Sequence, residues 1–189
     1  MGLHDIHAHL TDERLLADED GVIARARAAG VTTIVSNGLH PEDNQAVLAL
    51  SRRHPEVKPA FGLYPVNAVL PEMRAAGVEY PSADATDPDA AIDWLEANVD
   101  DCVAIGEIGL DRYWVPEPFW ALQEARFTRI VKLAMDADKP IIVHSRKAEA
   151  RTFELLKELG IQRVDWHCYS SKVKRGLQNY PYLYSVNSS

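Results

Sequence analysis

Short apolar runs rich in β-branched residues alternate along the chain with longer segments whose apolar residues have helical spacing. Residues 31–35 are Val, Thr and Ile throughout, which is typical of a strand buried on both faces. Over 18–29 the apolar residues recur on one helical face, and Gly30 follows as helix-terminating glycines do. The pattern predicts strands over 3–10, 31–35, 57–63, 102–108, 140–143, 163–166 and 182–186, and helices over 18–29, 41–54, 91–99, 117–138, 148–159 and 171–178.

Strands that alternate with helices predict an α/β fold with a parallel sheet, either an eight-stranded barrel or an open doubly wound sheet. No glycine-rich phosphate-binding motif follows the first strand, which weakens the dinucleotide-binding form of the open sheet. Polar residues cluster instead at the carboxyl ends of the strands, where barrel enzymes carry their sites. We therefore expect a TIM (β/α)8-type barrel, incomplete, with about seven strands present.

The length predicts a single domain over 1–189, with enough chain for a substantial core. The segment from 64 to about 90 interrupts the alternation, holds four prolines and has room for a short helix over 72–76. Loops this long in a compact domain are usually functional or mobile. We interpret it as an excursion over one end of the domain and not as a domain boundary.

The first predicted strand carries two histidines. Successive side chains of a strand point to opposite faces, so His7 and His9 share one face and Ile6 and Ala8 share the other. Two imidazoles on one face of a rigid strand can hold one metal ion, although a pair of ordinary polar residues is the alternative.

Three more residues of ligand type follow, each at the end of a predicted strand: Glu107, His144 and His167. In a barrel, these three and the histidine pair converge on one mouth. Imidazole and carboxylate groups suit divalent ions such as Zn²⁺, Mn²⁺ or Mg²⁺, and five ligands exceed what one tetrahedral site needs. We therefore expect two divalent metal ions, roughly 3.5–4 Å apart, with Glu107 as the bridging ligand.

Each candidate ligand also has a structural interpretation. Glu107 alone would suit a buried ion pair with Arg112 or Arg146. The later histidines alone would suit hydrogen-bonded core positions, with His167 packed beside Trp166. The occurrence of all five candidates at strand ends favours the metal site.

The composition limits the classes of partner. A net charge of −8 argues against a general basic surface for nucleic acid, but not against a local site where metal ions supply positive charge. The two cysteines, Cys102 and Cys168, indicate a reducing cytoplasm and small buried side chains. No secretion signal and no membrane-spanning run is apparent, so we expect a cytoplasmic protein. We expect Tyr113, Trp114 and Trp120 in the core and at its rim, not as base-stacking platforms.

Four segments resemble, in order and spacing, the TatD family of metal-dependent hydrolases within the amidohydrolase-like barrels: 5–10, 106–111, the region from Gln123 to Arg146, and 167–170. The resemblance covers nearly the whole chain and implies a metallo-dependent hydrolase barrel with DNA exonuclease or endonuclease activity. It further implies that His7, His9 and Glu107 hold the first metal ion. Glu107, His144 and His167 would hold the second.

The sequence departs from the family pattern in two places. The family usually has Gly-x-His-Pro-His after the third strand, where this chain has Tyr64 and Val66 in place of the histidines, which concerns substrate preference. The family also ends with an eighth strand carrying Glu-Thr-Asp-x-Pro, whose Asp binds the first metal ion and can act as general base. Nothing after His167 matches that motif, so the chain resembles a family member shortened at its C-terminus.

We predict a divalent-metal-dependent hydrolase that cleaves phosphodiesters of DNA, its nucleic-acid partner, with a water activated by two metal ions. Glu107 is the predicted catalytic residue, and Arg146 is predicted to contact a substrate phosphate, with a salt bridge to a nearby carboxylate as the alternative. Two other hypotheses remain. The barrel would hydrolyse an amide or an aminoacyl ester, or the shortened chain would bind metal without turnover.

Overall fold

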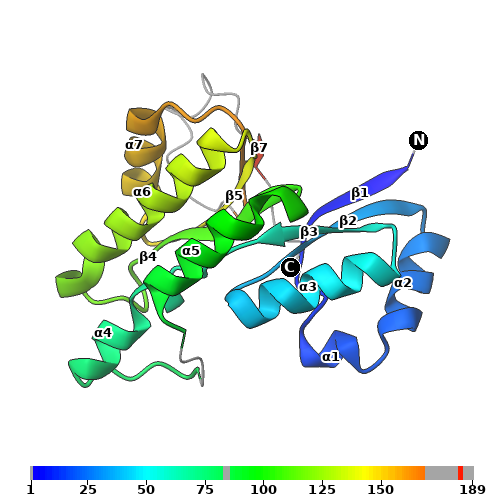
Figure 1. The fold of residues 1–189 in the computed structure, drawn as a ribbon, viewed down its shortest axis with the longest axis horizontal. Helices are drawn as coiled ribbons and strands as arrows, with labels where there is room; N and C mark the ends of the chain where they lie inside the picture. The colour runs from blue at the N-terminus through cyan, green and yellow to red at the C-terminus, as the bar shows by residue number, and fades with distance from the viewer. Residues whose placement is uncertain (1, 83–85, 169–182, 185–189) are drawn as a thin grey trace.

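The computed structural model describes residues 2–82, 86–168 and 183–184, and it places a parallel sheet beside a set of helices (Figure 1). The strands are β1 (Leu3–Ala8), β2 (Val31–Asn37), β3 (Val57–Phe61), β4 (Ala104–Asp111), β5 (Ile141–Arg146), β6 (Val164–Trp166) and β7 (Leu183–Tyr184). The helices are α1 (Glu13–Leu16), α2 (Glu19–Ala28), α3 (Pro41–Arg53), α4 (Leu70–Ala75), α5 (Pro88–Asn98), α6 (Trp120–Asp136) and α7 (Glu149–Leu159). Three short 3-10 turns are η1 (Asn67–Val69), η2 (Val99–Asp101) and η3 (Glu117–Phe119).

The seven strands lie in the order in which they occur in the sequence, and every neighbouring pair is parallel. A sheet in which each strand pairs with the next one along the chain, with a helix between most of them, is the arrangement of a (β/α) barrel. The predicted α/β class and partial barrel are therefore confirmed. Because all strands run the same way, their carboxyl ends meet at one edge of the sheet.

Most predicted elements are present within a few residues of the expected bounds. The short α1 is not predicted by hydrophobic spacing; it begins where the side chain of Asp12 accepts the backbone N–H of Arg14 at 2.9 Å. The helix expected over 72–76 is α4, which begins two residues earlier at Leu70. β4 continues to Asp111, beyond the predicted end at 108. The helix expected over 171–178 lies outside the described residues, and the strand expected over 182–186 contains β7.

Two hydrophobic clusters hold the helices on the sheet. The larger one joins β3 and β4 to α5, α6 and α7, and includes Phe61, Leu95, Ile105, Phe127 and Leu156, each at most 2% exposed. The smaller one packs α2 and α3 on β2 and β3, through Ile23, Ile34, Leu50 and Val57. Burial of each such side chain stabilises the fold by about 1.5–3 kcal/mol before entropy is counted. Within the described ranges, no helix is both long enough and apolar enough to cross a membrane.

β4 is buried on both faces, and an irregularity in its pairing decides where Glu107 lies. Ala104 packs in a cluster made of strand residues alone, which marks the inner face of the sheet. Ile105 and Ile108 both pack in the cluster that includes the helices, although they are three positions apart. Regular alternation does not allow this, and the register of β4 with β5 shifts between these two residues. The shift leaves Glu107 free to face the mouth of the sheet.

Gly62, just after β3, lies directly against the backbone of Glu107. A Cβ atom at position 62 would lie 2.4 Å from the backbone nitrogen of Glu107 and 2.6 Å from its backbone oxygen. The buried side chain of Asn44 on α3 fixes Gly62, because its amide donates to the Gly62 carbonyl and its Oδ1 accepts the Gly62 N–H, both at 2.9 Å. Helix α3 thereby positions the loop that supports the acid.

Gly62→Ala is expected to lower the free energy of unfolding by roughly 1–3 kcal/mol, since backbone on both sides must move to admit the methyl group. Gly21→Ala in α2 is the matched control: its Cβ meets only the exposed side-chain end of Asp18, which can rotate away. That change is expected to stabilise the protein by up to about 1 kcal/mol through helix propensity. Chemical denaturation measures both. A Gly62→Ala protein as stable as wild type would contradict the proposed close contact.

Candidate metal centre

Glu107 lies at the centre of the five predicted ligand residues. Its side chain is 4% exposed, and its two oxygens face different histidines. Oε1 is 2.9 Å from Nδ1 of His144, whereas Oε2 is 3.1 Å from Nε2 of His9 and 3.6 Å from Nε2 of His7. Burial raises the pKa of Glu107, but the hydrogen bonds to the three histidines outweigh it and hold the pKa well below its usual range. Glu107 is therefore an ionised carboxylate with a histidine on each side.

The alternative ion pairs of Glu107 with arginine do not form. The guanidinium of Arg112 bonds to Glu124 at 2.9 Å. The guanidinium carbon of Arg146 lies 3.9 Å from the ring centroid of Tyr113. Among the described residues, the hydrogen-bond and ion-pair partners of the Glu107 carboxylate are imidazoles.

The two histidines of the first strand point their Nε2 atoms at the same place. These atoms are 3.1 Å apart. The other ring nitrogen of His9, Nδ1, lies 3.0 Å from the carbonyl oxygen of Asn37 at the end of β2, so His9 donates there and keeps Nε2 unprotonated when neutral. Two imidazole nitrogens this close, both facing one carboxylate oxygen, form a donor set that suits a divalent cation.

His167 lies next to His7. Its ring stacks on the ring of His7, with centroids 3.4 Å apart and planes 8° apart. Burial and the charge of His7 lower the pKa of His167 to about 4, so its imidazole is neutral at pH 7 and can act as a ligand. His7, Glu107 and His167 each offer a ligand atom, and these atoms all lie within 4.8 Å of one another.

His144 lies between two carboxylates. Its Nδ1 faces Glu107, and its Nε2 is 3.2 Å from Oδ2 of Asp111. Burial lowers the pKa of His144, but the hydrogen bonds to Asp111 and Glu107 more than compensate and raise it to about 9. Asp111 is fully buried, and its Oδ1 accepts the backbone N–H groups of Tyr113 and Trp114, both at 2.8 Å.

Asp111 is the site residue that the sequence argument did not single out. Strand alternation did contain a signal, because Glu107 and Asp111 are four residues apart and residues at even spacing share a face. The prediction failed because the strand was expected to end at 108, which would have left Asp111 in a loop. Both cysteines were expected to be buried, which is confirmed for Cys102 and wrong for Cys168. Cys168 is partly exposed, with its Sγ 2.9 Å from Nε2 of His167.

A cavity of about 510 Å³ opens over these groups, lined in part by His9, Glu107, His144 and His167. Tyr64, which stands where the family pattern has a histidine, lies in the wall of this cavity. Its ring is edge-to-face against the ring of His144, with the centroids 5.1 Å apart. A histidine at this position would add a further nitrogen to the site, whereas Tyr64 presents a phenol. Its pKa is raised by burial and by the negative charges of Glu107 and Asp111, so the phenol is neutral.

A second group of acidic and histidine side chains forms ion pairs within the protein. Glu19, Asp20 and His54 also lie together, but Glu19 already bonds to Arg53 at 2.7 Å and to His54 at 2.8 Å. These contacts join α2 to the C-terminal end of α3 and include none of the five predicted metal ligands. They indicate a surface ion-pair network rather than a metal site.

Comparison with known proteins identifies the family of the chain. Residues 4–188 match the family described as TatD related DNase. An uncharacterized metal-dependent hydrolase of Bacillus subtilis, YabD, is 32% identical over 175 residues, which cover 91% of this chain and 62% of that protein. The 3'-5' ssDNA/RNA exonuclease TatD of Salmonella typhimurium is 32% identical over 157 residues, which cover 82% of this chain and 54% of that protein.

The same likeness holds for a solved structure. The crystal structure of YJJV, a TatD homologue from Escherichia coli K12, matches with a TM-score of 0.75 and 26% identity, over 91% of this chain and 62% of that one. The chain therefore spans 54% to 62% of the length of these three proteins. The resemblance found in the sequence is confirmed: the chain belongs to the TatD related DNase family.

Proposed function

We propose that this chain carries the metal centre of a divalent-metal-dependent hydrolase that cleaves phosphodiester bonds of nucleic acid. The observation that carries the proposal is the division of the Glu107 carboxylate, with Oε2 facing His7 and His9 and Oε1 facing His144. A carboxylate that faces two separate groups of nitrogen ligands is the arrangement expected of a bridge between two cations. The membership in a family of DNases supports nucleic acid as the substrate.

The proposed ligands of the two ions, Mg²⁺, Mn²⁺ or Zn²⁺, are His7, His9 and Glu107 for one and Glu107, His144 and His167 for the other. When bound, such ions polarise a phosphoryl oxygen and lower the pKa of water, so they supply both the nucleophile and the charge stabilisation. The protein's part is to hold five ligand side chains at strand ends: His7, Glu107 and His144 lie in β1, β4 and β5, and His9 and His167 directly follow β1 and β6. His9 is oriented by the Asn37 carbonyl, and His144 is oriented by Asp111.

Asp111 is a positioning residue in this proposal. A histidine ligand usually gives its second ring N–H to a carboxylate, which fixes the ring and its tautomer. The contact between Nε2 of His144 and Oδ2 of Asp111 meets that description, and it leaves Nδ1 directed toward Glu107. Asp111 is itself fixed by two backbone N–H donors, so the orientation of His144 is set by the strand end.

The test of the proposal is Mn²⁺- or Mg²⁺-dependent release of nucleotides from a single-stranded DNA oligomer. Wild-type chain is expected to release them, and Glu107→Gln is expected to reduce the rate on the order of a hundredfold or more, since it removes the bridging charge. Glu96→Gln, an exposed position on α5, is the matched control and is expected to leave the rate unchanged. Absence of metal-dependent release by folded wild-type chain, or equal rates in both variants, would overturn the proposal.

Metal content gives an independent measurement. Wild-type chain equilibrated with Mn²⁺ is expected to bind two ions, and Asp111→Asn is expected to weaken one of them roughly 10- to 100-fold, as loss of an orienting carboxylate does elsewhere. Equilibrium dialysis with metal analysis measures both affinities. Unchanged affinities in Asp111→Asn would show that Asp111 does not orient a ligand.

The pKa of His144 in metal-free protein gives a further prediction. Asp111→Asn is expected to lower that pKa from about 9 toward the ordinary histidine value, because it removes one of the two carboxylates that raise it. A raised pKa adds stability that is present below about pH 6.5 and is lost as the pH rises through 9. Metal-free wild type is therefore expected to lose more unfolding free energy than Asp111→Asn between these pH values. Titration of the histidine resonances by NMR checks the pKa of His144.

A further inference from the structure

Three aromatic side chains, Tyr80, Tyr113 and Trp114, form a cluster beside the metal cavity, and we call them the aromatic rim. The ring centroid of Trp114 lies 5.5 Å from that of Tyr80 and 5.0 Å from that of Tyr113, with the planes at 77° and 88°. These edge-to-face contacts fix the indole in one orientation. Trp114 is nevertheless 38% exposed and Tyr113 is 47% exposed, which is more than packing in the core would require.

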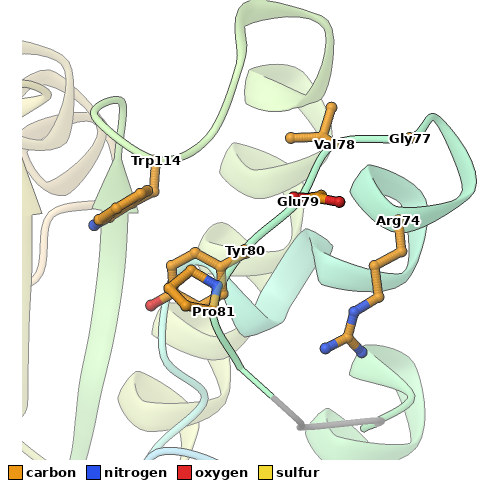
Figure 2. A pocket seen from close by; sticks show the side chains of 7 residues that line it. All are labelled: Arg74, Gly77, Val78, Glu79, Tyr80, Pro81 and Trp114. Atoms are coloured by element: carbon orange, nitrogen blue, oxygen red, sulfur yellow. The ribbon is translucent and has the colours of Figure 1, made fainter.

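The aromatic rim borders a second cavity of about 670 Å³, within the size range of ligand pockets. Figure 2 shows Trp114 entering from the loop after β4, while Tyr80 and Pro81 come from the segment after α4. Tyr80 and Pro81 also line the cavity over the metal centre, so the two cavities share a wall. A chain-like ligand held at the metal centre can therefore continue along the aromatic rim.

One side chain fixes the aromatic rim relative to the metal centre. Oδ1 of Asp111 accepts the backbone N–H groups of Tyr113 and Trp114, whereas Oδ2 of the same carboxylate contacts His144. The position of the indole is thus set by the residue that orients a proposed metal ligand. A surface tryptophan with a purely structural role would not need to share a supporting residue with a proposed metal ligand.

Positive charge accompanies the aromatic rings. Arg146 lies with its guanidinium carbon 3.9 Å from the Tyr113 ring centroid, and the Lys147 ammonium lies 4.7 Å from it. Across the ranges that the structure describes, no carboxylate forms an ion pair with either group. Both follow His144 within three residues, so they stand at the same strand end as the metal centre. In a chain of net charge −8, two such cations beside exposed aromatic rings indicate a local anion site.

We propose that the aromatic rim, together with Arg146 and Lys147, binds a nucleobase and its neighbouring phosphate in a single-stranded nucleic acid. The inference rests on the proposed function and adds to it the residues that hold the substrate strand. Aromatic side chains bind single strands by stacking on bases, and cations beside them contact the backbone. Trp114 is the stacking residue, and Arg146 and Lys147 contact phosphate as charged donors. A base paired within a duplex has no free face for this contact.

Binding is measured without hydrolysis, using the metal-free 189-residue chain in EDTA and a short fluorescently labelled single-stranded DNA in low salt. Trp114→Ala is expected to weaken binding roughly tenfold, and Trp114→Phe is expected to retain most of the affinity, because phenylalanine keeps a stacking face. Met135→Ala is the matched control, since Met135 is 40% exposed in the last turn of α6, at the end of that helix away from the strand ends that carry the site. Equal affinities of wild type and Trp114→Ala would overturn the inference.

The charged residues are tested in the same assay. Arg146→Gln and Lys147→Gln are each expected to weaken binding and to reduce its dependence on salt concentration. Lys132→Gln removes one charge from an exposed position on α6 and is expected to do neither. An equal loss in all three variants would show only a general charge effect and would contradict a local phosphate contact.

An abasic analogue identifies the base contact itself. Replacing one nucleotide at a time by a tetrahydrofuran abasic unit is expected to weaken binding by wild type at one position, and to have no effect there on Trp114→Ala. A fully abasic strand is expected to be hydrolysed with metal at equal rates by both proteins. Metal-dependent hydrolysis with no effect of Trp114→Ala on binding would refute the stacking site alone. Binding that depends on Trp114, with no hydrolysis, would refute the proposed function alone.

Discussion

The structure depends on one buried negative charge, which histidines at the carboxyl ends of two strands, β1 and β5, surround. A carboxylate with 4% of its side chain exposed would be strongly unfavourable without partners, and the imidazoles of His7, His9 and His144 supply them. The same residues give the site its potential as a metal centre, since each offers a nitrogen toward the acid. The histidines that stabilise the buried carboxylate of Glu107 are therefore the same residues that are proposed to hold the cations. Helix α3, through the hydrogen bonds of Asn44 to Gly62, helps to keep this acid in place.

The sequence alone was sufficient for the architecture. β-branched runs and helical spacing identified each strand of the sheet, because burial against helices demands the same residue types in any parallel sheet. The rule that barrel sites lie at the carboxyl ends of strands then predicts that five residues from separate segments meet at one place. His7 and His9 needed only the alternation of a regular strand. The structure places all five of these side chains around one cavity mouth or directly behind it.

Other features were not accessible from local patterns. The inward position of Glu107 depends on a register shift between Ile105 and Ile108, which is a property of pairing with β5 and not of the β4 sequence. Asp111 was missed because the length of β4 is set by hydrogen bonds to a neighbouring strand that the sequence does not reveal. The position of Trp114 likewise depends on a distant segment, because its ring packs against Tyr80 from the segment after α4. In each case the deciding contact lies between segments far apart in the chain.

The support of Glu107 by α3 has a consequence for how the effects of mutations in this protein would be interpreted. Asn44 and Gly62 line neither of the two cavities described above, and yet Asn44 holds Gly62 against the backbone of Glu107. In a genetic screen scored by loss of function, substitutions at these two positions would be grouped with substitutions at the proposed metal centre. Among related sequences, the residues at positions 44 and 62 are therefore expected to vary together with Glu107 and not with the rest of α3.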